Sequence, residues 1–241
     1  MKGMTPQAIA TAIGGRCLRP GAGPLVTRVS TDTRNSPAGA LFFALSGPRF
    51  DAHDFLLTAV ARGAAGLVVS DASRLPEPLA DHVAVIEVSD ALDALTQLAA
   101  HVRRTHPGRF VAITGSVGKT TVKDMAAAAL GAFGVVGATP GNWNNHVGLP
   151  LTLCGLTGDE AFVVLELGMS APGEIGALTR LAQPHVGLVT RASEAHLEFF
   201  TSVEAIADAK AELYVALPEG AVSVANADDP RMLSRARTLR P

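Results

Sequence analysis

The 241-residue sequence is poor in cysteine, in aromatic residues and in charge. Its two cysteines, Cys17 and Cys154, are too few for a disulfide framework, which fits a reducing compartment. Charged residues make up 17% and the net charge is −2, so electrostatics gives no support for nucleic-acid binding. The N-terminus has no apolar signal-peptide core, and the most membrane-like run, 125–139, is shorter than the ~18 apolar residues of a span. These absences predict a cytoplasmic protein without stable membrane insertion.

Apolar residues are plentiful, at 48% of the chain, so the sequence can form buried cores. The length favours two domains. The segment Thr105–Gly108 contains a Pro-Gly pair between two periodic segments, and such pairs commonly mark a break between elements. We therefore place the domain boundary there, with a first domain at 1–106 and a second at 107–241.

The first domain is predicted to be a small α/β unit. Thr5 and Pro6 favour the start of a helix, and the leucines of residues 90–104 recur on one helical face. Short apolar and β-branched runs favour strands. Helices are expected at 5–13, 54–62 and 90–104, strands at 25–31, 41–45, 66–70 and 83–88, and a polar loop at 46–53.

The second domain alternates predicted strands and helices. Runs such as Phe162–Leu165 are apolar on both faces, as parallel strands covered by helices on both sides must be. This pattern predicts a doubly wound α/β sheet, in which ligands bind beyond the C-terminal ends of the strands. Strands are expected at 109–114, 134–137, 161–167, 186–190 and 221–225, and helices at 119–130, 148–154, 173–181, 202–217 and near 230.

The stretch Ala112–Val122 places two glycines, a lysine and two consecutive threonines between a predicted strand and a predicted helix. That order aims backbone N–H groups and a helix N-terminus at phosphates. Lys119 can then reach the β- and γ-phosphates of a nucleotide, and Thr120 can ligate Mg²⁺. The leading glycine is Gly115 rather than residue 113, so the match to the general P-loop pattern is partial. A nucleoside triphosphate site is favoured over the alternative, an ordinary turn with a surface lysine.

Polar residues follow several of the predicted strands of the second domain. Glu166 ends an apolar strand, where a buried carboxylate needs a partner, and this favours a magnesium-related role over a carboxylate that simply reaches solvent. His196 follows the next strand; a lone histidine is more often structural, but Glu198 nearby makes a metal role worth testing. Asn226 follows a third strand.

Three further segments are candidates on weaker grounds. The loop 141–146 holds three amides and the only tryptophan, which favours ligand contact over turn chemistry. Asp32–Arg34 suits either an anion site or a surface salt bridge. Lys210 lies between Asp208 and Glu212 on a predicted helix, and the pattern alone predicts a solvated helix face.

Taken together, these segments resemble the Mur ligase family over about residues 5–233. The irregular spacing of the first glycine is the form of the P-loop that this family carries. The sequence departs from the family pattern at Met169–Pro172 and at Arg191. The resemblance rests on Asp32–Arg34, Ala40–Leu45, Gly47–Phe55, Thr114–Thr120, Gly141–Asn145, Gly148–Thr152, Glu166–Gly168, Gly173–Ile175, Glu194–Glu198 and Asn226–Asp228.

The resemblance implies a role for each matching residue. Lys119, Glu166, His196 and Lys210 would be catalytic, and Lys210 matches a lysine that the family carbamylates. Mg²⁺ would be held by Thr120, Glu166 and His196. ATP would contact Thr114, Gly115, Ser116, Val117, Gly118, Lys119, Thr120, Thr121 and, on the adenine side, Asn226. The UDP substrate would contact Asp32, Thr33, Arg34, Asn142, Asn144 and Asn145.

The resemblance also implies a fold and a reaction. A small α/β UDP-binding N-terminal domain would precede a doubly wound, mostly parallel P-loop ATPase domain. The reaction would be ATP-dependent joining of D-Ala-D-Ala to UDP-MurNAc-tripeptide through an acyl phosphate, by a monomer. The family's third, Rossmann-like domain has no counterpart in these 241 residues, so we expect ATP and UDP-substrate binding with little ligation. The alternatives are another Mur-type ligase, a non-catalytic nucleotide-binding module and a transport-type NTPase.

Overall fold

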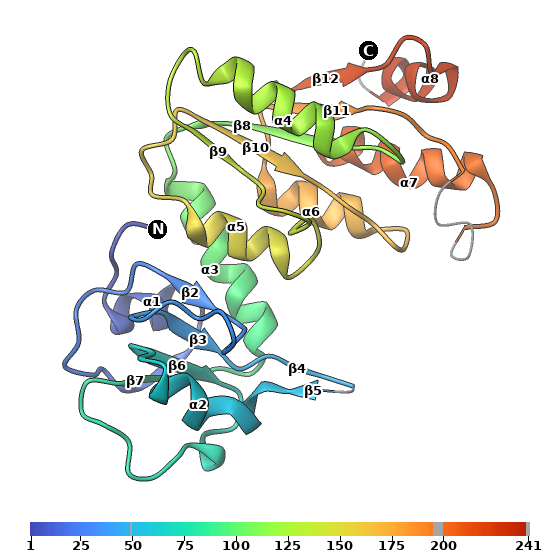
Figure 1. The fold of residues 1–241 in the computed structure, drawn as a ribbon. Helices are drawn as coiled ribbons and strands as arrows, with labels where there is room; N and C mark the ends of the chain where they lie inside the picture. The colour runs from blue at the N-terminus through green and yellow to red at the C-terminus, as the bar shows by residue number, and fades with distance from the viewer. Residues whose placement is uncertain (49, 195–199, 240–241) are drawn as a thin grey trace. The chain divides into compact units, whose positions relative to one another are not determined.

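The computed structural model describes residues 1–48, 50–194 and 200–239, and its chain divides into two compact units (Figure 1). The first unit comprises Met1–Arg104 and Leu153–Thr157, and the second comprises Thr105–Thr152 and Gly158–Pro241. The short segment 153–157 thus belongs to the first unit, which a division of the sequence into two consecutive parts does not anticipate.

The first unit is built on a five-stranded sheet of order β1-β7-β6-β3-β2. Its strands run parallel except β1, which pairs antiparallel with β7. The strands are β1 (Arg16–Arg19), β2 (Val29–Ser30), β3 (Leu41–Phe43), β6 (Gly66–Val69) and β7 (Ala84–Glu87). The helices are α1 (Pro6–Ala12), α2 (Leu56–Ala61) and α3 (Ala91–Thr105), with 3-10 turns at Ala52–Phe55 and Ala72–Arg74.

Burial explains which predicted elements of this unit formed. Phe42, Leu56 and Leu67 are almost fully buried in one apolar cluster, as expected for a strand, a helix and a strand that share a core. Three predictions need correction. Residues 16–19 form a strand that was not predicted, the strand expected at 25–31 is confined to Val29–Ser30, and the expected polar loop at 46–53 contains a hairpin of β4 (Ser46–Gly47) and β5 (Phe50–Asp51).

The second unit confirms the predicted doubly wound sheet. Its five strands are all parallel, in the order β12-β11-β8-β10-β9. The strands are β8 (Arg109–Thr114), β9 (Val136–Ala138), β10 (Phe162–Glu166), β11 (Val186–Val189) and β12 (Val222–Ala225). The helices are α4 (Lys119–Leu130), α5 (Gly148–Gly155, of which residues 153–155 are grouped with the first unit), α6 (Glu174–Ala182), α7 (Val203–Ala216) and α8 (Pro230–Leu239).

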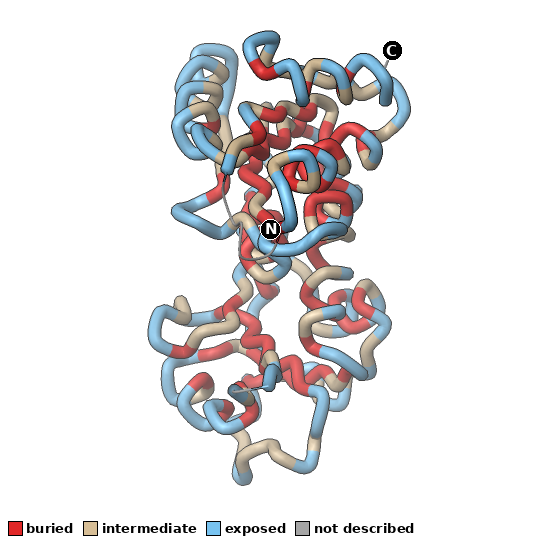
Figure 2. The backbone as a smooth tube through the Cα atoms, turned by 90° about the vertical axis from the view of Figure 1, so that its right-hand side faces the viewer, coloured by how far each residue is buried: buried red, intermediate tan, exposed pale blue. Residues whose placement is uncertain are grey.

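Helices cover both faces of this sheet, with α4 on one face and α6 and α7 on the other (Figure 1). This follows from the strand order, because right-handed crossovers in opposite directions from the centre place their helices on opposite faces. The central strands are buried, whereas the connecting loops are largely exposed (Figure 2). β8 lies between β10 and β11, so the segments that leave these three strands meet at one edge. Among the described residues, no helix has the length and apolar character to cross a membrane.

Candidate functional site

A glycine-rich turn joins β8 to α4, as the sequence predicts. Gly118 precedes the helix with a left-handed backbone (φ 79°), a conformation that glycine adopts without strain. Gly115 is required for a different reason, because a Cβ there would lie 1.8 Å from Thr190 Oγ1. Lys119 Nζ donates to the Gly115 carbonyl oxygen at 2.9 Å, so the lysine side chain lies back along the turn. Strand, turn and helix therefore have the arrangement of a phosphate-binding loop.

The turn forms one wall of a cavity of about 540 Å³. Its lining combines residues of the turn with residues from the loop before α5, from β10 and the loop after it, and from α6 and α7. Most of the sequence-predicted residues of the second unit are brought together here. The lining residues are 115–121, Asn144, Asn145, His146, Glu166, Gly168, Met169, Ser170, Glu174 and Lys210.

Glu166 is the buried carboxylate of this cavity, with 3% of its surface exposed. It accepts hydrogen bonds from Thr120 Oγ1 and from Asn144 Nδ2, each at 2.8 Å. Its backbone N–H donates to Thr139 Oγ1 at 2.9 Å. Both carboxylate oxygens are therefore held in place, and the alternative of a carboxylate that simply reaches solvent is wrong.

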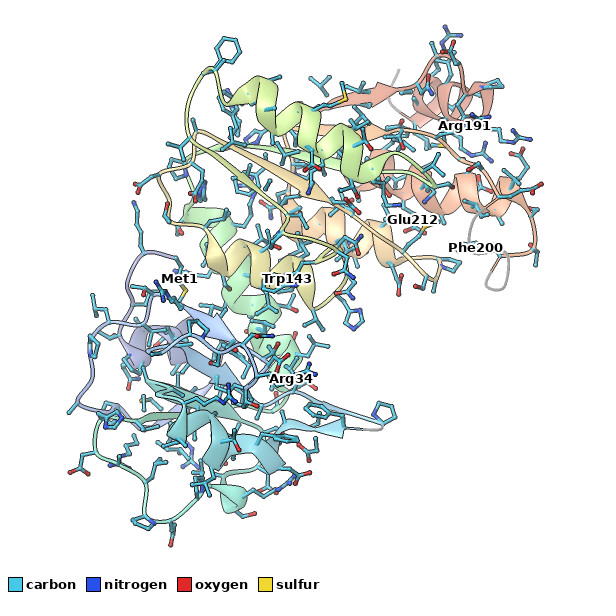
Figure 3. The ribbon with its side chains drawn as sticks, in the orientation of Figure 1. Met1, Arg34, Trp143, Arg191, Phe200 and Glu212 are labelled. Carbon is cyan, nitrogen blue, oxygen red and sulfur yellow. The ribbon has the colours of Figure 1, made fainter. Side chains whose placement is uncertain are left out.

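The loop before α5 divides its three amides between different tasks. Asn144 contacts Glu166, whereas Asn145 Oδ1 accepts from the N–H groups of Val147 and Gly148 at the start of α5. The third amide, at position 142, is exposed and is not among the residues that line the cavity. Trp143 is 45% exposed and lies in the same loop (Figure 3).

Lys210 is buried in the cavity wall with 2% of its surface exposed, so the solvated helix face expected from its pattern is wrong. Burial, with a smaller contribution from the charge of Lys119, lowers the pKa of Lys210 to about 7. Its helix neighbour Glu212 points instead to the start of α6 (Figure 3). There its carboxylate accepts from the N–H groups of Gly173 and Gly176, at 2.6 and 2.9 Å.

The oxygen atoms around Thr120 and Glu166 are of the kind that Mg²⁺ prefers, a hydroxyl beside a carboxylate. Among the residues that the structure describes, no three His, Cys, Asp or Glu side chains gather as a metal site on their own. A divalent cation bound there would therefore need phosphate or water oxygens as further ligands. His196, the other candidate ligand, lies outside the described residues.

A second cavity, of about 460 Å³, lies in the first unit and contains the segment Asp32–Arg34. Arg34 and Asp32 form a salt bridge at 2.7 Å, and these mutual contacts lower the pKa of Asp32 and raise the pKa of Arg34. Phe50 and Phe55 stack with ring centroids 5.6 Å apart on the cavity wall. The cavity thus joins a cation to an aromatic surface, a combination suited to a planar anionic ligand. Its lining comprises Thr31, Asp32, Thr33, Arg34, Phe42, Phe50 and Phe55.

The structure also buries two charged residues of the second unit to which the sequence assigned no role, Lys123 and Asp229, although Asp229 belongs to the polar segment 226–229 that follows a predicted strand. Lys123 is 5% exposed and donates to the Thr139 carbonyl oxygen at 3.0 Å. Asp229 is 3% exposed and accepts from the Ala192 N–H at 2.8 Å. Asp229 had a readable signal, because an aspartate directly before a proline is typical of a helix start. Asn226 Oδ1 accepts from the Asp228 N–H, and Asn226 is not among the residues that line the cavity of the second unit.

The chain is similar to known proteins both in sequence and in fold. The family described as "Mur ligase middle domain" matches residues 113–240, and "Mur ligase family, catalytic domain" matches residues 25–103. The UDP-N-acetylmuramoyl-tripeptide–D-alanyl-D-alanine ligase of Escherichia coli K12 is 44% identical over 209 residues, which are 87% of this chain and 45% of the relative.

Two solved structures agree with this result. A crystal structure of MurF from Acinetobacter baumannii superimposes with a TM-score of 0.88 at 31% identity, and the match covers 100% of this chain and 52% of that one. MurF ligase from Thermotoga maritima, solved in complex with ADP, gives a TM-score of 0.76 at 32% identity over 88% of this chain and 48% of that one. This chain therefore spans about half the length of these relatives. Because the middle-domain match alone covers more than half of the 241 residues, the chain belongs to the Mur ligase family.

Proposed function

We propose that the chain supplies the ATP site and the UDP-substrate site of a cytoplasmic, monomeric ligase that joins D-Ala-D-Ala to UDP-MurNAc-tripeptide. One observation carries this proposal. The glycine-rich turn and helix start at residues 115–121, called the phosphate-binding turn below, line one cavity together with the buried Glu166 and the buried Lys210. The relative from E. coli is named for this reaction, and the relative from T. maritima binds ADP. Phosphoryl transfer needs mainly positioning and charge neutralisation, and this cavity has the groups for both.

In the proposed complex the β- and γ-phosphates of ATP lie along residues 114–121. Backbone N–H groups of the turn and the N-terminus of α4 would receive phosphate oxygens. Lys119 would leave the Gly115 carbonyl oxygen and bind the phosphates instead, because its flexible side chain can reach either position. Asn226, at the end of β12, would contact the adenine side.

Mg²⁺ would be held by Thr120 and Glu166, with His196 as a further ligand. The fit rests on the hydroxyl–carboxylate pair, which is already in contact at 2.8 Å, and on Asn144, which fixes the second carboxylate oxygen. When bound, the ion would neutralise charge on the phosphates during transfer. Asn144 would keep Glu166 oriented toward Thr120 throughout.

The proposed chemistry has two steps. A carboxylate oxygen of the tripeptide bonds to the γ-phosphorus of ATP while the bond from that phosphorus to ADP breaks, which gives an acyl phosphate. The neutral amine of D-Ala-D-Ala then attacks the acyl carbon and loses a proton to solvent, and the bond from that carbon to the phosphate oxygen breaks, which releases inorganic phosphate as the amide forms. Lys119 would neutralise charge on the transferred group.

Lys210 would contribute after carbamylation. Its lowered pKa leaves a large share of the side chain as the neutral amine near neutral pH, which is the form that adds to CO₂. The amine nitrogen bonds to the carbon of CO₂ as one C–O double bond becomes single, and the nitrogen then loses a proton to solvent. The neutral amine thus becomes an anion; counted from the protonated lysine, two protons leave. This change would place a second carboxylate across the cavity from the lysine of the phosphate-binding turn.

The first unit would bind the uridine diphosphate part of the substrate in its own cavity. Arg34 would donate to the diphosphate, and Asp32 would keep the guanidinium oriented. The stacked Phe50 and Phe55 offer an apolar surface to a planar base. Asn142 and Asn145 would contact the sugar-peptide part of the substrate.

Calorimetry with the 241-residue chain and its Lys119→Ala variant tests the proposal. We expect Mg²⁺·ADP to bind the parent chain and to bind the variant about 100-fold more weakly, because a charge-assisted contact to phosphate is lost. Equal affinity would contradict the proposal. UDP-MurNAc-tripeptide binding separates the proposal from a generic NTPase, because only the proposed ligase has a site for it.

A further inference from the structure

The segment Thr190–Ser193 leaves β11 and contacts the phosphate-binding turn from the side opposite β10. Thr190 Oγ1 donates to the Val117 carbonyl oxygen at 2.6 Å. The same oxygen occupies the place that a side chain at Gly115 would need. The turn is therefore packed directly against this segment.

Ser116 connects the two segments in both directions. Its N–H donates to the Arg191 carbonyl oxygen at 2.7 Å. Its hydroxyl accepts from the Ser193 N–H and donates to the Ser193 carbonyl oxygen, each at 3.0 Å. The direction in which this residue of the turn points therefore depends on where residues 191–193 lie.

Asp229 holds the same segment from its other side. One carboxylate oxygen, Oδ2, accepts from the Ala192 N–H at 2.8 Å. The other, Oδ1, accepts from the N–H groups of Arg231 and Met232 in the first turn of α8, at 3.1 and 3.3 Å. A helix cap needs only one acceptor oxygen, and serine, asparagine and aspartate serve about equally well there. Only a carboxylate has a second acceptor oxygen for Ala192.

We infer that Asp229 is a positioning residue for the phosphate-binding turn, acting through Ala192, Ser193 and Ser116. Its Oδ2 fixes the backbone of residue 192, and the neighbouring residue then fixes Ser116 by two hydrogen bonds. A turn that binds phosphates with backbone N–H groups gains affinity when those groups are oriented before the ligand arrives. The role in ATP affinity rests on the proposed function, whereas the role in holding the turn does not.

The substitution Asp229→Ser separates the two tasks of this carboxylate. Serine keeps a capping oxygen for α8 and loses the acceptor for Ala192. Asp228→Ser is the matched control, because the carboxylate of Asp228 is exposed and only its backbone N–H contacts Asn226. We expect amide hydrogen exchange to accelerate in the peptide 114–121 of Asp229→Ser and to stay unchanged in the control.

In the same experiment, amide hydrogen exchange in α8 reports whether the N-terminal cap of this helix is kept. Faster exchange in α8 with an unchanged phosphate-binding turn would make Asp229 a helix cap only and would overturn the inference. This measurement needs no nucleotide, so it decides the role of Asp229 even if the proposed function fails.

Calorimetry with Mg²⁺·ADP then tests whether the role extends to binding. We expect the Kd of Asp229→Ser to rise about three- to tenfold, the effect of one lost hydrogen bond, with Asp228→Ser unchanged. Ser116→Ala removes the two hydroxyl hydrogen bonds to Ser193, through which Asp229 is inferred to act, and keeps the bond from its backbone N–H to Arg191. Adding Asp229→Ser to Ser116→Ala should therefore change the Kd by less than about twofold, because the two residues act in series.

Two results would overturn the binding role. One is a parent-like Kd for Asp229→Ser. The other is a Kd of the double variant that rises by the full product of the increases in Asp229→Ser and Ser116→Ala. Failure of the parent chain to bind Mg²⁺·ADP would instead contradict the proposed function. In that case the exchange rates of the peptide 114–121 remain the deciding measurement for Asp229.

Discussion

A lysine with 2% exposure inside a cavity that already contains another lysine is a costly arrangement. Lys210 sits in this position, on a helix whose neighbouring acidic residues face elsewhere. The cost falls when the amine is neutral or when it becomes an anion. The environment of this side chain thus favours the neutral amine, which is the state that the proposed carbamylation requires.

The pH dependence of stability should show this cost directly. The pKa of Lys210 is about 7 in the folded chain and 10.5 for an ordinary lysine, so between these pH values the unfolded chain binds more protons. The contribution of Lys210 to stability therefore rises with pH over this window, by at most about 1.4 kcal/mol per pH unit. Urea unfolding at pH 7 to 10 in CO₂-free buffer should show a steeper rise for the parent than for Lys210→Met. The exposed Lys2→Met is the control, and parallel curves for Lys210→Met and the parent would contradict the expectation.

A second prediction at the residue scale compares the nucleotide affinity of Asn144→Ala with that of Asn142→Ala. Asn144→Ala removes the donor that fixes one oxygen of Glu166, whereas Asn142→Ala changes an exposed amide of the same loop. We expect the Kd for Mg²⁺·ADP to rise about tenfold in Asn144→Ala, because Glu166 loses its orientation toward Thr120. Asn142→Ala should bind nucleotide like the parent. Equal affinities in both variants, measured by calorimetry, would remove Asn144 from the nucleotide site.

Single residues differ in how much of their role the sequence reveals. Glu166 could be identified because a carboxylate at the end of an apolar strand needs a partner. Lys210 could not be identified from its pattern, because a lysine between acidic residues resembles a solvated helix face until tertiary packing shows which side is covered. Asp229 combines a local cap with a contact to a residue 37 positions away, and only the local part is visible in the sequence.

At the scale of elements, the strands and helices of the second unit were the most predictable. α4 begins and ends at the predicted residues, because the glycine turn and its helix are defined by local signals. The strands of the first unit were harder to predict from the sequence. β1 has an arginine at each end of the pair Cys17–Leu18 and lies at the edge of its sheet, and such a short, charged edge strand lacks the apolar run that marks a buried one. The hairpin at 46–51 has only two residues per strand, too short for any periodicity.

The helix α5 depends on Asn145 at its start. Asn145 Oδ1 accepts from two N–H groups that would otherwise lack an intrahelical acceptor. Asn145→Ala should therefore lower the free energy of unfolding by about 1 kcal/mol, a typical value for a lost N-cap. Asn142→Ala is the matched control in thermal or urea unfolding. A parent-like midpoint for Asn145→Ala would show that water replaces the cap without cost.

At the scale of the whole molecule, each unit has a cavity made of its own residues. The cavity of the first unit joins Arg34 to stacked aromatic rings, and that of the second joins the phosphate-binding turn to Glu166 and Lys210. A nucleotide site alone would suit any NTPase. Two chemically different cavities are what the proposed function requires, one for ATP and one for the nucleotide-linked acid.

Because the two cavities share no lining residue, their ligands should respond to separate substitutions. Arg34→Ala should weaken UDP binding about tenfold through the loss of a charge-assisted contact, and it should leave the Kd for Mg²⁺·ADP unchanged. Lys119→Ala should do the reverse. Arg28→Ala, an exposed arginine outside the cavity lining, controls for a general loss of positive charge. Calorimetry of UDP and Mg²⁺·ADP against all three variants checks the pattern. If Arg34→Ala and Arg28→Ala weakened UDP binding equally, the attraction would come from net charge, and the cavity of the first unit would lose its assignment as the UDP site.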